Sequence, residues 1–357
     1  MFNIKTNFIK MKISYLSILF FFLTTSYLIA QNESINEEKF ISIGGIEQWI
    51  TIKGDDKTKP AILFLHGGPG STLSQFENNI YGGWEKDFVL INWDQRGAGK
   101  TYGRNTPFEI NEEYYVKNPL KVEQMTKDGI ELTKYILDYL DKQKVILVGT
   151  SWGSILGMLM ILDSPELFDA YVGHSQVVNF SKNINYAYKK VYELAISTED
   201  NISLEILNTL GDPPYDNARS YGQLLRIIKK YERDNSIPAP DSWWKIASQY
   251  DNEKDSKARY DGDDYSFINF VGHEKLGIES MVSAIDFDKD GLVIEIPVYL
   301  IQGEQDILTS KMITKPYFDK IKAPKKEYFL VPDAAHGHNQ PIVDKQLEVV
   351  KYIVSDK

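Results

Sequence analysis

Short apolar runs recur along the chain from about residue 38 onward, and amphipathic stretches separate them. Several runs are continuous Val, Ile and Leu segments, which are typical of parallel strands covered on both faces of a sheet. We therefore expect strands over residues 61–66, 88–94, 144–151, 170–178, 297–306 and 326–333.

The stretches between these runs follow the period of a helix. Residues 122–140 and 342–354 each place apolar side chains near one face. Residues 39–54 differ, because strand-like segments flank Gly44 and Gly45, the pattern of a β-hairpin. The alternation of strands and helices predicts an α/β fold with a mostly parallel sheet flanked by helices.

This alternation stops between residues 179 and 290, where the sequence is helical, polar and rich in aromatic residues. We expect residues 31–178 and 291–357 to form two parts of one core, with 179–290 inserted between them as a helical cap. Ligands of open parallel sheets bind outside the carboxyl ends of the strands. A cap at that edge would roof the binding site.

The N-terminus has a pattern of its own. Three lysines precede the apolar stretch 13–30, and Gln31 follows it. A basic start, an apolar stretch and a small residue at the border predict that residues 1–30 are a secretory signal, cut after Ala30. The exported, periplasmic or secreted protein would then have no stable membrane partner. The alternative is an uncleaved membrane anchor, because the stretch nearly spans a bilayer; Met11 offers a second start site.

Charge and residue usage exclude several function classes. The 357 residues carry 40 basic and 50 acidic side chains, a net charge of −10, which argues against a nucleic-acid partner. The chain has no Cys, so thiolate metal sites are excluded. No zinc-binding pair is formed by its five histidines, His66, His174, His273, His336 and His338. We expect neither a metal nor a cofactor.

The segment Gly149-Thr150-Ser151-Trp152-Gly153 follows a predicted strand and precedes a predicted helix. That context is the one in which G-x-S-x-G forms a sharp turn with an exposed serine. Ser151 is therefore the candidate nucleophile. The two glycines are expected because side chains there would collide.

A nucleophilic serine needs a base and an acid that orients the base. In the chain order Ser, acid, His, the candidates after Ser151 are Asp306 and His336, each just past a predicted strand. Glu304 is an alternative acid, and His338 is an alternative base.

The run His66-Gly67-Gly68-Pro69-Gly70 ends another predicted strand. Acyl transfer places negative charge on a carbonyl oxygen, and that charge needs fixed N–H donors. One donor follows the nucleophile, and the other comes from the loop after the third strand. We expect these donors to be the backbone N–H of Trp152 and the backbone N–H of Gly68 or a direct neighbour of Gly68.

Residues 66–70, 94–101 and 149–154 together resemble the prolyl aminopeptidase (proline iminopeptidase) family of α/β-hydrolases. The resemblance implies the α/β-hydrolase fold with Ser151 as nucleophile, Asp306 as acid and His336 as base. It also implies an oxyanion hole formed by Gly68 and Trp152. In the family the loop at 94–101 supports the site, so Asp94 and Arg96 are expected to form a structural ion pair.

Members that release N-terminal proline hold its amine with carboxylates of the cap, often near a Trp-Glu pair. In this chain Lys245 stands in place of that acid, within the segment 242–247. The candidate amine partners are Glu193, Glu205 and Glu232.

These features predict an exported serine hydrolase with an acyl-enzyme intermediate and a small peptide or ester substrate. An aminopeptidase that releases N-terminal residues is the first hypothesis. A carboxylic ester or lactone hydrolase is the alternative. A third hypothesis is a hydrolase-fold binding protein without catalysis, although the complete Ser, Asp and His order argues against it.

Overall fold

The structure, a computed structural model, describes residues 33–356. The predicted signal sequence over residues 1–30 lies outside the described residues. Within residues 33–356, no helix combines the length and the apolar character needed to cross a bilayer.

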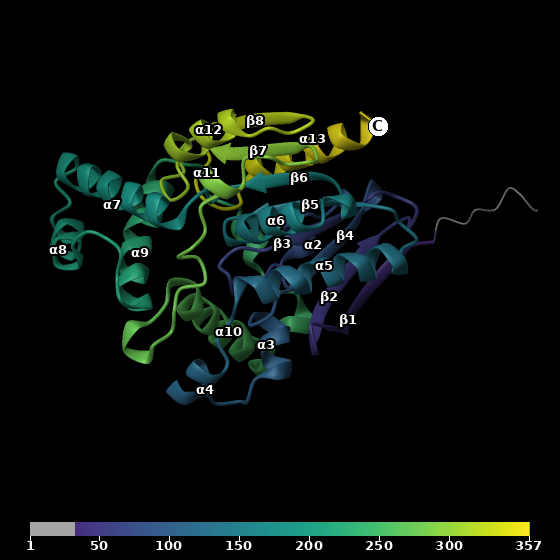
Figure 1. Cartoon of the computed structure of the whole chain (residues 1–357), viewed down its shortest axis with the longest axis horizontal. Coiled ribbons are helices and arrows are strands. Elements are labelled where there is room, and N and C mark those ends of the chain that lie inside the picture. Colours follow the sequence, from purple (N-terminus) through teal and green to yellow (C-terminus); the bar gives the residue numbers. More distant parts are fainter. Residues whose placement is uncertain (1–32, 357) are drawn as a thin grey trace, which may run out of the picture.

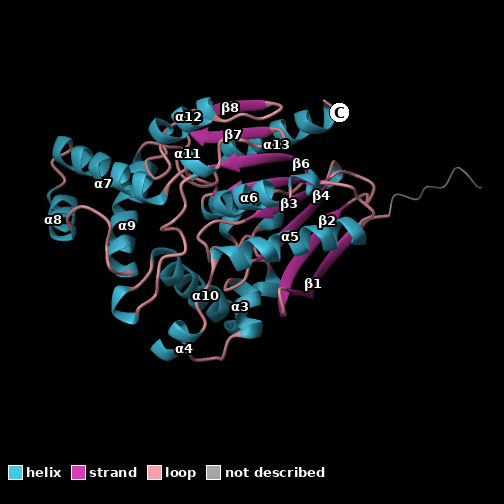
Figure 2. Cartoon of the chain, in the orientation of Figure 1, coloured by secondary structure: helices cyan, strands magenta, loops and turns pink. Residues whose placement is uncertain are grey.

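An eight-stranded sheet forms the centre of the described chain, in the order β1-β2-β4-β3-β5-β6-β7-β8 (Figure 2). β1 and β2 pair antiparallel, as do β2 and β4, and the remaining pairs are parallel. This confirms the predicted mostly parallel sheet. The strands are β1 (Ile35–Ile43), β2 (Ile46–Gly54), β3 (Ala61–Leu65), β4 (Val89–Asp94), β5 (Val145–Thr150), β6 (Phe168–His174), β7 (Val298–Gly303) and β8 (Lys326–Val331).

Helices cover both faces of this sheet. In β3, Leu63 and Leu65 belong to one buried apolar cluster, whereas Ile62 and Phe64 belong to the other. Because successive strand residues point to opposite faces, an apolar run is needed to fill both clusters. The helices outside the β6–β7 segment are α2 (Glu77–Ile80), α3 (Gly99–Asn105), α4 (Glu112–Lys117), α5 (Val122–Tyr139), α6 (Trp152–Asp163), α12 (Lys311–Lys320) and α13 (Gln340–Ser355).

The chain between β6 and β7 is helical and lies beyond the carboxyl ends of the parallel strands (Figure 1). Three of its helices begin at an asparagine whose side chain accepts a hydrogen bond from the third helical residue, at Asn179, Asn217 and Asn252. Such caps satisfy backbone donors that the helix itself leaves free. The helices are α7 (Phe180–Ser197), α8 (Asn201–Leu210), α9 (Ala218–Asp234), α10 (Glu253–Val271) and α11 (Phe287–Asp290).

Two of these helices contact the parts of the core that lead to the candidate site. α10 packs on α3, where Tyr265 and Tyr102 have ring centroids 5.6 Å apart. The hydroxyl of Ser266 on α10 also donates to the backbone oxygen of Gly97 at 2.8 Å. The last turn of α9 carries Glu232, which reaches the loop after β7. These contacts join the helical segment to the chain after β4 and to the loop after β7.

Candidate active site

Ser151 lies at a sharp turn between β5 and α6, with φ 54° and ψ −117°. This backbone conformation is rare for a residue other than glycine. A Cβ on Gly149 would come within 2.4 Å of the Gly153 backbone oxygen, and one on Gly153 within 2.1 Å of the Leu65 backbone oxygen. Both positions therefore require glycine, which explains the spacing of the motif.

The structure brings Asp306 and His336 to Ser151 from two separate loops. His336 Nε2 lies 2.9 Å from Ser151 Oγ, and His336 Nδ1 lies 3.2 Å from Asp306 Oδ2. Because Nδ1–H must donate to the carboxylate, Nε2 is left to accept the Ser151 proton. This chain of contacts is the geometry that serine activation requires.

The environment of this cluster keeps Asp306 ionised and favours the charged form of His336. Burial acts to raise the Asp306 pKa, but His336 and hydrogen bonds from Thr309 outweigh it and lower the pKa to about 2. The Thr309 N–H and hydroxyl donate to the two carboxylate oxygens at 2.7 and 2.6 Å. Burial acts to lower the His336 pKa, but the charge and hydrogen bond of Asp306 raise it above its ordinary value.

The two alternative residues have other partners. His338 Nε2 lies 3.0 Å from the hydroxyl of Tyr81, and burial lowers the His338 pKa to about 4. Glu304 forms an ion pair with Lys311, with 3.0 Å between Oε1 and Nζ. Neither side chain contacts Ser151 within the described residues, so the geometry favours His336 and Asp306.

The glycine-rich loop after β3 packs directly on the nucleophile. A Cβ on Gly67 would lie 3.3 Å from Ser151 Cβ, and Gly68 has φ +107°, a conformation that favours glycine. Within residues 33–356, neither Gly68 N–H nor Trp152 N–H donates to another group. Both N–H groups therefore remain the candidate oxyanion donors.

The expected ion pair between Asp94 and Arg96 is wrong. Arg96 instead pairs with the fully buried Asp128 of α5 at 2.6 Å, and it donates to the backbone oxygen of Gly44 at 2.7 Å. Asp94 accepts from the hydroxyl of Ser74 at 2.7 Å and from the backbone N–H of Lys100 at 2.8 Å. The chain turns after β4, so the two side chains point to different elements. Each of the two side chains therefore has partners other than the one predicted.

The three candidate carboxylates of the helical segment differ in their surroundings. Glu193 and Glu205 are exposed, whereas Glu232 is 4% exposed. Glu232 Oε1 accepts the backbone N–H groups of Ile307 at 2.7 Å and of Leu308 at 3.2 Å, directly after Asp306. Burial and the charge of Asp306 raise the Glu232 pKa. Glu232 therefore contacts the loop that carries the candidate acid.

A row of aromatic rings extends from Trp152 into the helical segment. Trp152 and Phe270 have ring centroids 5.8 Å apart, and Phe270 and Phe180 are 4.9 Å apart. Phe180 continues the row to Tyr221 at 5.7 Å. These edge-on and tilted contacts form a mostly buried apolar cluster that joins Trp152 to the helical segment.

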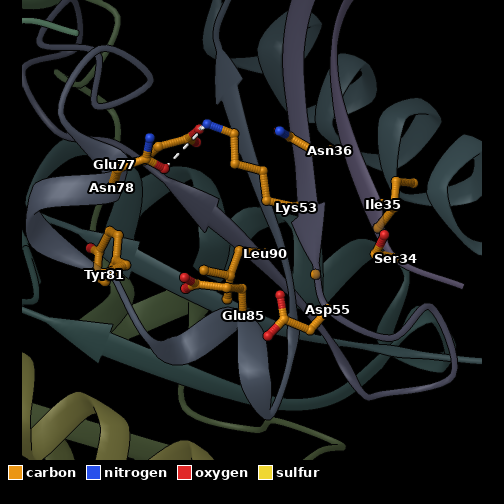
Figure 3. A pocket seen from close by; sticks show the side chains of 12 residues that line it. Ser34, Ile35, Asn36, Lys53, Asp55, Glu77, Asn78, Tyr81, Glu85 and Leu90 are labelled. Carbon is orange, nitrogen blue, oxygen red and sulfur yellow. Dashed lines mark hydrogen bonds and ion pairs between the residues drawn. The ribbon is translucent and has the colours of Figure 1, made fainter. Parts of the chain in front are cut away.

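A separate pocket of about 330 Å³ opens between β1, β2 and α2 (Figure 3). Lys53 and Glu77 form an ion pair at its wall, and Tyr81 also lines it. None of its lining residues belongs to the cluster at Ser151. Within the described chain, no group of three His, Cys, Asp or Glu side chains is placed to hold a metal ion.

A model of the α/β hydrolase fold family matches residues 60–338. The chain belongs to this family. The sheet order and the site at the carboxyl edge of the strands agree with that membership, which confirms the predicted α/β-hydrolase fold.

Two relatives and one solved structure show which α/β-hydrolases this chain is similar to. The chain is 27% identical to a probable aminopeptidase YbaC of Bacillus subtilis, over 87% of this chain and 93% of that protein. It is 26% identical to a proline iminopeptidase of Lactobacillus helveticus, over 80% of this chain and 87% of that protein. A proline iminopeptidase of Mycobacterium smegmatis has the same fold, with a TM-score of 0.60, 15% identity, and coverage of 89% of this chain and 98% of that one. The predicted similarity to proline iminopeptidases is confirmed.

Proposed function

We propose that this α/β-hydrolase is an exported serine hydrolase that acts through an acyl-enzyme intermediate, and that it releases N-terminal residues from small peptides. The observation that carries the proposal is the 2.9 Å contact between Ser151 Oγ and His336 Nε2, with Asp306 behind it. The similarity to aminopeptidases supports the choice of substrate.

In the proposed reaction, Ser151 Oγ attacks the carbonyl carbon while its proton passes to His336 Nε2. The Gly68 and Trp152 N–H groups donate to the oxyanion. When this intermediate collapses, the C–N bond breaks and His336 returns the proton to the leaving nitrogen. Water then loses a proton to His336 and attacks the Ser151 ester. As the ester C–O bond breaks, His336 returns that proton to Ser151 Oγ, which releases the acid and restores the serine.

Glu232 is the proposed partner of the substrate amine. A buried ammonium without a partner is prohibitively costly, so an exposed Glu193 or Glu205 would not serve. Glu232 is buried, and its Oε1 is held by two backbone donors. The two hydrogen bonds to its side chain from the described residues both end on Oε1, so Oε2 is the oxygen that we propose meets the ammonium.

Replacing Glu232 with Gln should weaken aminoacyl substrates by about 2–5 kcal/mol in kcat/KM, because one partner of a buried charge pair is lost. The amide oxygen still accepts the two backbone bonds, so folding should be retained. Turnover of an uncharged ester should barely change. Steady-state kinetics on both substrate types test this, with Glu193→Gln and Glu205→Gln as exposed controls.

The same variant should shift the pH dependence. The negative charge of Glu232 raises the His336 pKa, so its removal should lower that pKa. Because only neutral His336 accepts a proton, the acidic limb of kcat/KM for an ester should move to lower pH. If all three Gln variants keep aminopeptidase activity, Glu232 does not bind the amine.

A substrate screen of the purified protein tests the function itself. Proline arylamides, other aminoacyl arylamides and short acyl esters should be compared at equal concentration. We expect the aminoacyl arylamides to be hydrolysed with the higher kcat/KM. Hydrolysis of esters or lactones alone would instead favour the ester hydrolase.

Export predicts a mature N-terminus at Gln31, in a fraction outside the cytoplasm. The basic and apolar order of residues 1–30 motivates this expectation. N-terminal sequencing of the protein from its native host tests whether the mature chain begins at Gln31. A full-length chain in the membrane fraction would identify an uncleaved anchor.

A further inference from the structure

Gln95 follows directly after β4 and is fully buried. Its side-chain Oε1 accepts a hydrogen bond from the indole N–H of Trp152 at 2.8 Å. Its Nε2 donates to the backbone oxygen of His66 at 3.2 Å. One amide group therefore joins two loops, the turn after β5 and the glycine-rich loop after β3.

The backbone of Gln95 adds a third hydrogen bond, which also reaches the glycine-rich loop. Its N–H donates to Nε2 of His66 at 3.3 Å, so the imidazole proton must lie on Nδ1. Nδ1 then donates to the backbone oxygen of Gly67 at 2.8 Å. Burial lowers the His66 pKa to about 4, which keeps this ring neutral. His66 thus transmits the position of Gln95 to the residue before Gly68.

We propose that Gln95 is a positioning residue for the oxyanion hole, which sets the separation between the loops that supply the Gly68 and Trp152 donors. This inference rests on the proposed serine hydrolase function. Oxyanion donors must lie about 2.7–3.1 Å from the oxygen that becomes charged, so a small shift of one loop removes much of their effect. Gln95 itself does not contact the reacting atoms.

Gln95→Leu keeps the side-chain volume but removes both side-chain bonds. We expect kcat to fall about ten- to hundredfold with little change in KM, less than the loss of a complete donor, which costs about 10²–10³-fold. Affinity for a boronic acid, which forms a tetrahedral adduct with serine, should fall by a similar factor. Binding of the leaving amine product should be unchanged, because it carries no oxyanion.

Gln48 provides a matched control. It is also fully buried, and its Oε1 accepts from the indole N–H of Trp93 at 2.8 Å. Its Nε2 donates to the backbone oxygen of Ile43 at 3.2 Å and to Asp128 at 2.9 Å. Gln48→Leu should lower Tm, since it too leaves buried groups unpaired. Its kcat and boronic acid affinity should stay within about twofold of the wild type, because Gln48 contacts neither loop.

Trp152→Phe removes the other end of the same bond but keeps the backbone N–H. If Gln95→Leu does not fold, Trp152→Phe replaces it in the test. Trp152→Phe should lower kcat without raising KM. In the double variant the two losses should add less than fully, because both variants break the same Trp152–Gln95 bond.

Equal kcat in Gln95→Leu, Trp152→Phe and Gln48→Leu, after correction for the folded fraction, would overturn the positioning role. So would a rise in KM at constant kcat. A wild type that neither hydrolyses any substrate nor reacts with a fluorophosphonate overturns the proposed function as well. A reactive wild type with unaffected variants overturns this inference alone.

Discussion

Replacing Ser151 with Ala is expected to remove all covalent labelling by a fluorophosphonate and to lower kcat by about 10⁶-fold. The expectation follows from the 2.9 Å contact with His336, which accepts the serine proton as Oγ attacks. Intact-protein mass spectrometry should show one phosphonyl group on the wild type and none on the variant. Alanine keeps the Cβ and adds no bulk, so the turn at φ 54° should be retained.

Ser175→Ala is the matched control for this experiment. Ser175 is also buried and has a positive φ of 52°, at the end of the neighbouring strand β6. Its variant should label like the wild type. Equal labelling of Ser151→Ala would show that the nucleophile is another residue.

His336→Ala should lower kcat by at least about 10⁴-fold, because a nucleophile, its base and the acid act as a unit. His338→Ala should lower kcat less than about tenfold, since His338 contacts Tyr81 rather than Ser151. Steady-state kinetics on the best substrate of the screen measure both values. The comparison separates two histidines that are only two positions apart.

The pH profile gives an independent test of the same assignment. Asp306 raises the His336 pKa, so the acidic limb of kcat/KM should lie above the ordinary histidine pKa of about 6.5. Burial lowers the His338 pKa to about 4. An acidic limb near pH 4 would instead identify His338 as the base. A larger loss of kcat in His338→Ala than in His336→Ala would do the same.

Local patterns in the sequence determined the strands, the hairpin at Gly44-Gly45 and the turn at Ser151. Each depends on residues close together in the chain: apolar runs that fill both faces of a sheet, and glycines where a side chain would collide. The order of Ser151, Asp306 and His336 was also predictable, because the carboxyl ends of parallel strands meet at one edge.

Tertiary contacts decided which polar groups meet at that edge. Arg96 pairs with Asp128 on a distant helix rather than with Asp94 nearby, because the chain turns after β4. Glu232 differs from the other two candidate carboxylates only because the last turn of α9 reaches the loop after β7. Gln95 lies within the 94–101 motif, but nothing in the sequence indicates its bonds to Trp152 and His66.

The two histidines show the physical reason most clearly. Gly337 lies between them with φ +102°, so His336 and His338 face different neighbours. A sequence specifies which side chains emerge near the strand ends, since that follows from period and order. Their directions depend on loop backbone angles and on packing against segments tens to hundreds of residues away, and only the folded chain supplies those.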